Sequence, residues 1–338
     1  MTNDLNDNGK EPKTNIEILT AKANALAEKI RTLNAIAGGN VELRAKLSPI
    51  VMQMLRAEHV YIPEKIVTKY RKQDYGYKTV TLHPEDLLTT LPEEDSDKKY
   101  QPIFANSSGP WNADSYFQLD GNNKKFKVLW LLKEPYNVKW DKGDRGGHNQ
   151  AEDFKEYKYE ELYTTHKNLI KYTQSLFEYL GVHLTVKETM LRICIIQLNH
   201  FPGLSFKSKS TSKKLDSQEW RNWVDINREL LYSLFKFYNP HFIITGGVHD
   251  AIREKNYLQD IIEAIENNTF FAKFGISTNA NFKDLEKELL ESDGSYIVPS
   301  ENKFPIIIQM NHPSYININL EQLAKVDSLG ITKVLSHK

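Results

Sequence analysis

The residues of this sequence that could do chemistry follow short apolar segments. Glu134 comes shortly after "VLWLL", Asn199 after "ICIIQL" and His312 after "IIIQMN", and the segment "FIIT" is followed by Gly246 and Gly247. Side chains of these types can hydrogen-bond a substrate and move protons. The carboxyl ends of parallel strands meet at one edge of a sheet, which is where α/β proteins place their sites. The sequence therefore predicts a polar site assembled from distant residues.

Each of these residues also has an ordinary structural explanation. Glu134 and Asn199 can be solvated turn residues, and His312, which precedes a proline, can be a cap. A glycine pair after a strand can serve a tight turn. The prediction of a site depends on the combination, because every member follows a segment with the composition of a buried strand.

Alternating strands and helices in the second part of the chain are expected to position these residues. We predict strands over residues 125–132 and 191–198 and in "PHFIITGG" and "FPIIIQMNHPSY", and helices over residues 155–180 and in "SQEWRNWVDINRELLYSLFKFYN" and "YININLEQLAKVDSLGI". Nearly continuous apolar strands alternating with amphipathic helices are typical of a parallel sheet covered on both faces. The predicted fold class is α/β, with three α/β/α layers around a central four-stranded parallel sheet.

The first hundred residues follow a different pattern. Residues 1–14 are polar and are expected to be disordered, whereas residues 15–58 show apolar positions three and four apart around a glycine pair, which predicts two helices. The charged stretch 92–102 carries a proline at each end. We therefore expect a domain boundary there, between a mainly helical region over residues 15–100 and a domain over residues 101–338.

Composition limits the class of protein. The 338 residues are 40% hydrophobic and 26% charged, as in globular proteins, and Lys+Arg and Asp+Glu both total 44. The overall charge thus gives no indication of a polyanion partner, although it leaves a local basic patch open. The single cysteine, Cys194, excludes an internal disulfide and sites built from several cysteines. We read no signal peptide and no membrane span, and we expect a cytoplasmic monomer without a cofactor or metal.

The order of the motifs resembles the uracil-DNA glycosylase superfamily. In that family the first strand ends in a Gly-Gln-Asp-Pro-Tyr-like motif, a middle strand ends in an asparagine that reads the flipped base, and the last strand ends in His-Pro-Ser. The matching stretches are "LKEPYN" (132–137), "LNHFPG" (198–203) and "NHPSY" (311–315). The resemblance covers roughly residues 125–330.

The resemblance implies a monofunctional DNA glycosylase, which hydrolyses the N-glycosidic bond of uracil or a modified pyrimidine and leaves an abasic site. The reaction generates an oxocarbenium-like sugar and an anionic base. Glu134 would stabilise the sugar cation and orient water, and His312 would donate to the base oxygen. Asn199 would read the Watson–Crick edge with its adjacent donor and acceptor, and Tyr136 would be a pocket wall that excludes a C5 methyl group.

Further contacts to DNA follow from the resemblance or from charge. Ser314 would contact a phosphate, and Ile316 would fill the space left by the flipped base, with packing onto the core as an equal alternative. Stacking on the base is assigned to Trp140 or Phe154, with His148 a weaker candidate. The loop "KSKSTSKK" is either a solvated loop or a track for the backbone of single- or double-stranded DNA. Its lysines are Lys207, Lys209, Lys213 and Lys214.

Two residues depart from the family pattern. Glu134 stands where the family commonly has aspartate, and Leu132 stands where it has glycine. Because a misplacement of about 1 Å can cost ~100-fold in rate, a base other than uracil fits, including a modified cytosine of phage DNA and hence a role in antiphage defence. One alternative is an inactive glycosylase-fold protein that binds DNA or a partner. Another is an unrelated α/β hydrolase or nucleotide-binding protein, although none of the glycine-rich motifs of those classes follows a predicted strand.

Overall fold

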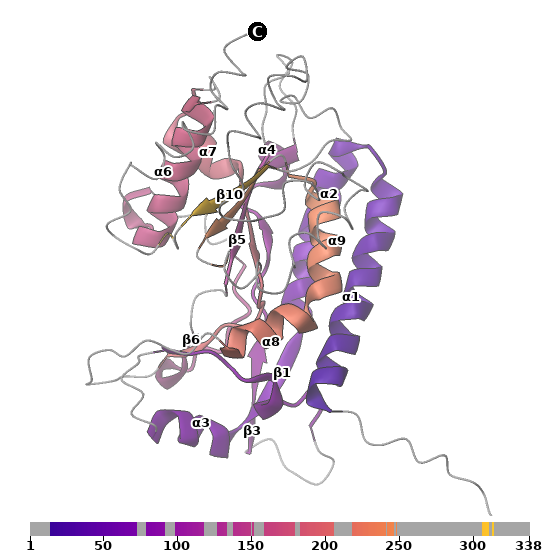
Figure 1. The fold of residues 1–338 in the computed structure, drawn as a ribbon, viewed down its shortest axis with the longest axis vertical. Helices are drawn as coiled ribbons and strands as arrows, with labels where there is room; N and C mark the ends of the chain where they lie inside the picture. The colour runs from indigo at the N-terminus through magenta and orange to yellow at the C-terminus, as the bar shows by residue number, and fades with distance from the viewer. Residues whose placement is uncertain are drawn as a thin grey trace, which may run out of the picture.

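The computed structural model of the chain describes it in separate stretches. These are residues 14–72, 79–91, 99–117, 127–133, 138–149, 151, 159–179, 183–205, 218–240, 242–246, 248, 306–310 and 313. Nearly all of the predicted tail, the helix predicted after residue 315 and the loop "KSKSTSKK" lie outside them. The described residues form a mixed α/β fold, which agrees with the predicted class (Figure 1).

The largest sheet among the described residues has five strands in the order β10–β9–β5–β7–β4. Its parallel strands are β5 (Val128–Leu132), β7 (Ile193–Gln197), β9 (Phe242–Gly246) and β10 (Ile306–Met310). They fall within the four segments predicted as strands. The edge strand β4 (Gly109–Pro110) runs antiparallel to β7 and was not predicted, because two residues of this type carry no strand periodicity. The sheet is therefore mixed in orientation.

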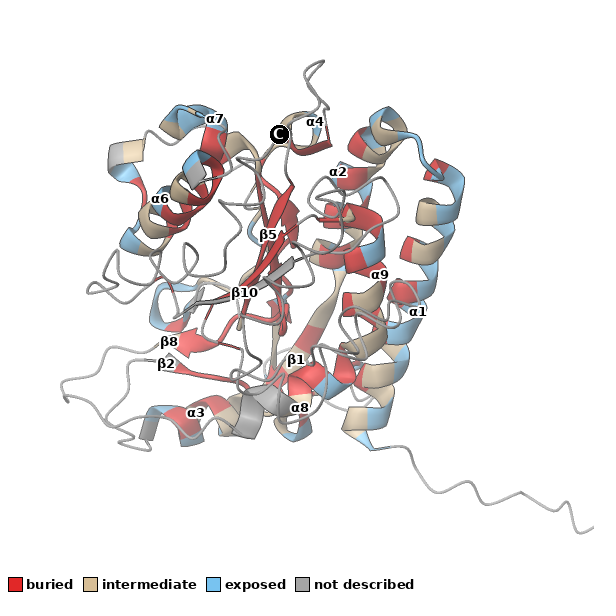
Figure 2. Cartoon of the chain, turned by 45° about the horizontal axis from the view of Figure 1, so that its top comes forward, coloured by how far each residue is buried: buried red, intermediate tan, exposed pale blue. Residues whose placement is uncertain are grey.

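Helices cover both faces of this sheet. On β5, Trp130 belongs to a hydrophobic cluster with α6 (Thr164–Tyr179), whereas its neighbour Leu131 belongs to a second cluster with α9 (Arg228–Tyr238). Alternate side chains of a strand point to opposite faces, so a strand covered on both sides is expected to be apolar at nearly every position. All five residues of β5 are buried for this reason (Figure 2).

The helix predicted before β9 is in fact two helices. α8 (Gln218–Ile226) ends before Asn227, and α9 begins directly after it. The Asn227 side-chain amide donates to Leu198 O at 3.1 Å, just beyond the end of β7. The residue at the break thus makes a contact across the fold, which helical periodicity alone does not reveal.

The two helices predicted in the N-terminal region are confirmed as α1 (Asn15–Ala37) and α2 (Val41–Ala57). A capping box between Thr14 and Glu17 starts α1, and the Asn40 side chain caps α2. α1 packs along α9, and its apolar face joins the same hydrophobic cluster as β5. The domain division at residues 92–102 stays a prediction.

A smaller set of elements lies beyond the carboxyl ends of β5 and β7. β2 (Thr79–Val80), β8 (Leu204–Ser205) and β6 (Val138–Lys139) form a three-stranded sheet, with α3 (Glu64–Lys72) at the same end of the molecule (Figure 1). The other described elements are β1 (His59–Pro63), which pairs with β3 (Tyr100–Phe104), the helices α4 (Ala113–Phe117) and α7 (Val186–Leu191), and the 3₁₀ turns η1 (Pro84–Asp86), η2 (Trp140–Lys142) and η3 (Tyr159–Glu161). None of the described helices combines the length and the apolar character that a membrane crossing requires.

Candidate functional site

The ends of β5 and β7 remain paired beyond the strands themselves. Leu198 N–H donates to Leu132 O at 2.8 Å, and Asn199 N–H donates to Lys133 O at 2.9 Å. These bonds hold Asn199 beside the residue that precedes Glu134 in the sequence. Two of the predicted strand ends are therefore direct neighbours.

The ends of β9 and β10 approach the same place. A Cβ atom added to Gly246, the last residue of β9, would lie 2.7 Å from Leu132 Cδ2 and 3.2 Å from Pro313 Cδ. The Asn168 side-chain amide on α6 donates to Pro313 O at 2.6 Å and so fixes the residue that follows His312. The glycine allows the three segments to come this close, which is a more specific role than the turn that sequence reasoning offered.

Asn199 is the predicted site residue whose surroundings are most informative. Its side chain is fully buried, and Oδ1 accepts a hydrogen bond from Phe201 N–H at 2.9 Å. Its Nδ2 group is buried without an acceptor among the described residues. Leaving a buried donor unpaired costs about 1–3 kcal/mol, so folded proteins rarely do so without a reason. Nδ2 of Asn199 is thus a buried donor whose acceptor is not found among the described residues.

A buried polar network lies next to Asn199. The Ser108 hydroxyl donates to Gln197 Oε1 at 2.5 Å, and its oxygen lies 3.0 Å from His200 Nδ1. Because the hydroxyl proton is committed to Gln197, Nδ1 of His200 must carry the proton and donate. Burial lowers the pKa of the His200 imidazole to about 4, so the ring is neutral near neutral pH.

The remaining nitrogen of His200, Nε2, is buried without a donor among the described residues. His200 lines a cavity of about 30 Å³ between α1, α8 and the segment after β7. That volume holds one water molecule, and most of the lining is aliphatic or aromatic. Sequence reasoning missed this histidine, and its position directly after Asn199 was the only available signal.

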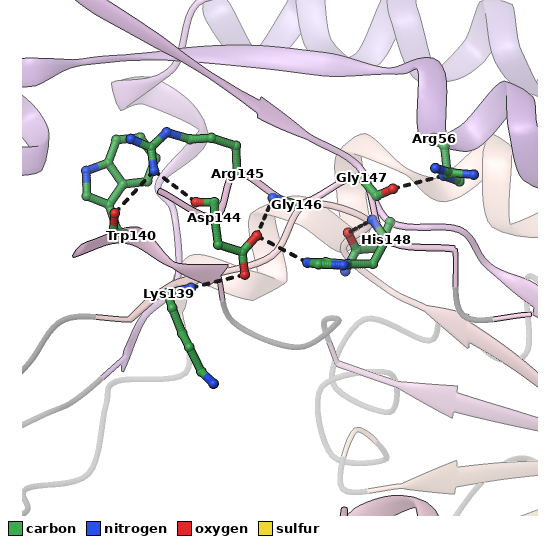
Figure 3. Close-up of polar contacts among 9 residues, drawn as sticks. Arg56, Lys139, Trp140, Asp144, Arg145, Gly146, Gly147 and His148 are labelled. Carbon is green, nitrogen blue, oxygen red and sulfur yellow. Dashed lines mark hydrogen bonds and ion pairs between the residues drawn. The ribbon is translucent and has the colours of Figure 1, made fainter. Parts of the chain in front are cut away.

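Trp140, a predicted stacking residue, packs inside the protein. The residue is 4% exposed, and the Arg145 guanidinium carbon lies 3.7 Å from the centroid of the Trp140 ring. Arg145 also donates to Trp140 O at 3.2 Å and to Asp144 O at 2.9 Å, which holds the cation in place (Figure 3). A base could stack on this face only after Arg145 had moved, so Trp140 serves the loop in this conformation.

The loop that follows η2 carries a carboxylate–imidazole pair that was not predicted. His148 Nε2 lies 3.1 Å from Asp144 Oδ1, and the imidazole is 45% exposed (Figure 3). Partial burial raises the pKa of the Asp144 carboxyl, but hydrogen bonds from Gly146 N–H and Lys139 N–H and the charge on His148 outweigh it, so the pKa is lowered. The predicted stacking role of His148 stays open, because its ring reaches the surface.

The backbone conformation of this loop requires glycine residues at two positions. Gly146 and Gly147 adopt φ values of +85° and +76°, and a Cβ at Gly146 would overlap Phe104 O. Gly147 N–H donates to Phe104 O at 3.2 Å, and Gly147 O accepts from Arg56 Nε at 2.9 Å. The loop is thus docked onto the end of β3 with its imidazole outward.

The other predicted site residues lie outside the described part of the chain. They are Glu134, Tyr136, Phe154, His312, Ser314, Ile316, Lys207, Lys209, Lys213 and Lys214. Within the described ranges, no three His, Cys, Asp or Glu side chains come together as metal ligands would. No protein-family model matches this sequence, and no curated protein matches it either.

Proposed function

We propose that this protein is a monofunctional DNA glycosylase that acts on a flipped uracil or modified pyrimidine. Glu134 orients the attacking water and stabilises the sugar cation, and His312 donates to the departing base. Asn199 binds the Watson–Crick edge of the base, and Tyr136 limits the size of the group at C5. The product is an abasic site, formed without a cofactor.

The observation that carries this proposal is the unpaired Nδ2 donor of Asn199. This Nδ2 group is buried at the carboxyl end of β7. The backbone N–H of Asn199 donates to the carbonyl oxygen of Lys133, the residue before Glu134. A pyrimidine carbonyl is an acceptor of the kind this amide lacks. The parallel order of β7, β5, β9 and β10 supports the proposal too, because it brings the segments with the acid and the histidine toward one edge.

Leu132 argues for a base other than plain uracil. Its side chain is 6% exposed and belongs to the hydrophobic cluster with α6, where it packs against Gly246. The leucine in place of the family's glycine adds bulk beside Gly246 and removes a close backbone approach. The longer acid at residue 134 shifts the carboxylate, and a misplacement of about 1 Å can cost ~100-fold in rate on the family's usual base. We therefore propose a modified pyrimidine, such as a modified cytosine of phage DNA, as the preferred target.

The same bulk at Leu132 favours a second candidate function. In that case the chain keeps the glycosylase fold and binds DNA without excising a base. The two candidate functions are distinguished by the free base, which only the glycosylase releases.

The test is a base-release assay on single- and double-stranded DNA that carries uracil or a panel of modified cytosines, read by mass spectrometry of the freed base. Wild-type protein should release one base and leave abasic sites. Glu134→Ala and His312→Ala should each slow release at least ~100-fold. Glu178→Ala, which removes an exposed glutamate on α6, serves as the matched control and should not slow it.

Folded protein that releases no base from any substrate contradicts the proposal. If that protein still binds DNA, the second candidate stands in its place.

A further inference from the structure

α3 concentrates positive charge in a chain whose overall charge is zero. Its nine residues, "EKIVTKYRK", contain four basic side chains and a single acid, Glu64. Val67 and Tyr70 are buried and anchor the helix, whereas Lys65 and Lys69 lie one helical turn apart and are exposed. The helix therefore turns an apolar face to the core and a cationic face to solvent.

The segment around η2 lies along α3 and extends this charge. At one end of the helix, Arg71 Nη2 pairs with Asp141 Oδ1 at 3.2 Å. At the other end, burial lowers the pKa of Arg145, and the nearby Glu64 carboxylate opposes that change, so Arg145 is within electrostatic reach of Glu64. Two further lysines of this segment, Lys139 and Lys142, are exposed.

Three carboxylates near this surface have partners among the described residues. Asp86 accepts a hydrogen bond from the Tyr70 hydroxyl, Asp141 pairs with Arg71, and Asp144 pairs with His148. Within the part of the chain that the structure describes, no carboxylate pairs with Lys65, Lys69, Lys139 or Lys142. These four exposed ammonium groups therefore have no carboxylate in contact among the described residues, and we call them the α3 lysine surface.

The α3 lysine surface lies at the end of the molecule where β5 and β7 finish. Lys139 in β6 pairs with Ser205 in β8, the next strand along the chain after β7, and β6 lies at the same end of the molecule as α3 (Figure 1). Lys133, directly after β5, reaches Thr81 in the segment that follows β2 at 3.5 Å. The charge is thus next to the strand ends that carry Asn199.

We propose that the α3 lysine surface binds the phosphate backbone of DNA beside the candidate site. The proposal rests on the proposed function for the identity of the polyanion. Unpaired lysines that project from a helix and an adjacent turn bind phosphates as point charges and release condensed counterions. They carry no base specificity and hold the duplex in position while the strand-end residues act on the base.

The N-terminal helices differ in what their exposed and buried faces do. α1 packs against α9 and completes the hydrophobic core, whereas α3 leaves its basic face to solvent. Exposed lysines on α1 and α2, such as Lys29 and Lys46, provide a matched comparison of equal charge at another place on the protein.

The experiment measures DNA affinity by fluorescence anisotropy over a range of salt concentrations, using the full chain and an uncleavable duplex. Lys65→Gln/Lys69→Gln and Lys139→Gln/Lys142→Gln are compared with the control Lys29→Gln/Lys46→Gln. Each lost phosphate contact should reduce the slope of log K against log salt by about 0.9 and weaken binding about tenfold near 0.1 M salt. The control pair should match the wild type. In the release assay the test pairs should raise KM and leave kcat unchanged.

The outcomes separate this inference from the proposed function. If wild-type protein binds and cleaves DNA while the test pairs behave as the control, the surface assignment is wrong and the function stands. If the test pairs lose salt-dependent affinity but no base is ever released, the surface stands and the glycosylase assignment fails. If the wild type binds polyglutamate as tightly as DNA and the test pairs lose both, the assignment of DNA as the partner is wrong and an acidic protein takes its place. Wild-type protein that binds no DNA overturns both.

Discussion

Protonation of His200 should weaken the fold as the pH falls, and the structure allows the size of the effect to be worked out. His200 is 3% exposed, its Nδ1–H donates to Ser108 Oγ, and the residue lines a largely apolar cavity. A second proton would have to be placed on Nε2, where no described acceptor receives it. The folded state therefore resists protonation, which the unfolded chain accepts readily.

The magnitude follows from the two pKa values. Burial lowers the pKa of His200 from 6.5 to about 4 in the folded protein. Because the unfolded state binds more protons in this interval, the free energy of unfolding rises with pH between the two values and is lost as the pH falls through it. The full loss is about 3 kcal/mol, of which about 2 kcal/mol falls between about pH 7 and pH 5.

Urea denaturation at the two pH values measures this loss. His200→Gln keeps an amide that can donate to Ser108 but cannot take up a proton in this range, so its stability should fall by about 2 kcal/mol less than that of the wild type. His166 provides an independent comparison, since burial lowers its pKa to about 4 as well. His166→Gln should likewise lose about 2 kcal/mol less unfolding free energy than the wild type between the two pH values, and in the double variant the two differences should add. If wild type and His200→Gln lose the same free energy between the two pH values, the reasoning is refuted.

Two further predictions concern the loop and the site. Gly146→Ala should destabilise the protein by about 1–3 kcal/mol, because a left-handed alanine is strained and its Cβ meets Phe104 O. Gly143→Ala, which has φ of +80° but nothing within 4 Å of the added Cβ, should cost less in the same thermal melts, and equal losses would exclude the overlap as the cause. Asn199→Asp keeps the acceptor for Phe201 N–H but removes the unpaired donor, so single-turnover base release should fall about 100-fold or more. Unchanged release in that variant would show that the amide does not bind the base.

Local pattern was enough to locate the strands and the first two helices. The segments that became β5, β7, β9 and β10 are apolar at nearly every position, a composition typical of strands in a parallel sheet covered on both faces. The glycine pair and the apolar spacing likewise located the ends of α1 and α2. From these strands, the general rule for parallel sheets predicted that Asn199 would lie beside the end of β5, and the backbone bond to Lys133 agrees with it.

Other features were decided by contacts between residues far apart in the sequence. Asn227 at the helix break bonds to Leu198, the Arg145 guanidinium covers the ring of Trp140, and β4 pairs with the edge of β7. The unpaired nitrogen of His200 and the lysines of the α3 lysine surface, which no described carboxylate contacts, are likewise properties of the assembled surface and core. Local sequence specifies which faces are apolar, because periodicity is a property of neighbouring residues. Which polar groups remain without a partner is decided only when the whole chain has packed, because each partner comes from another element.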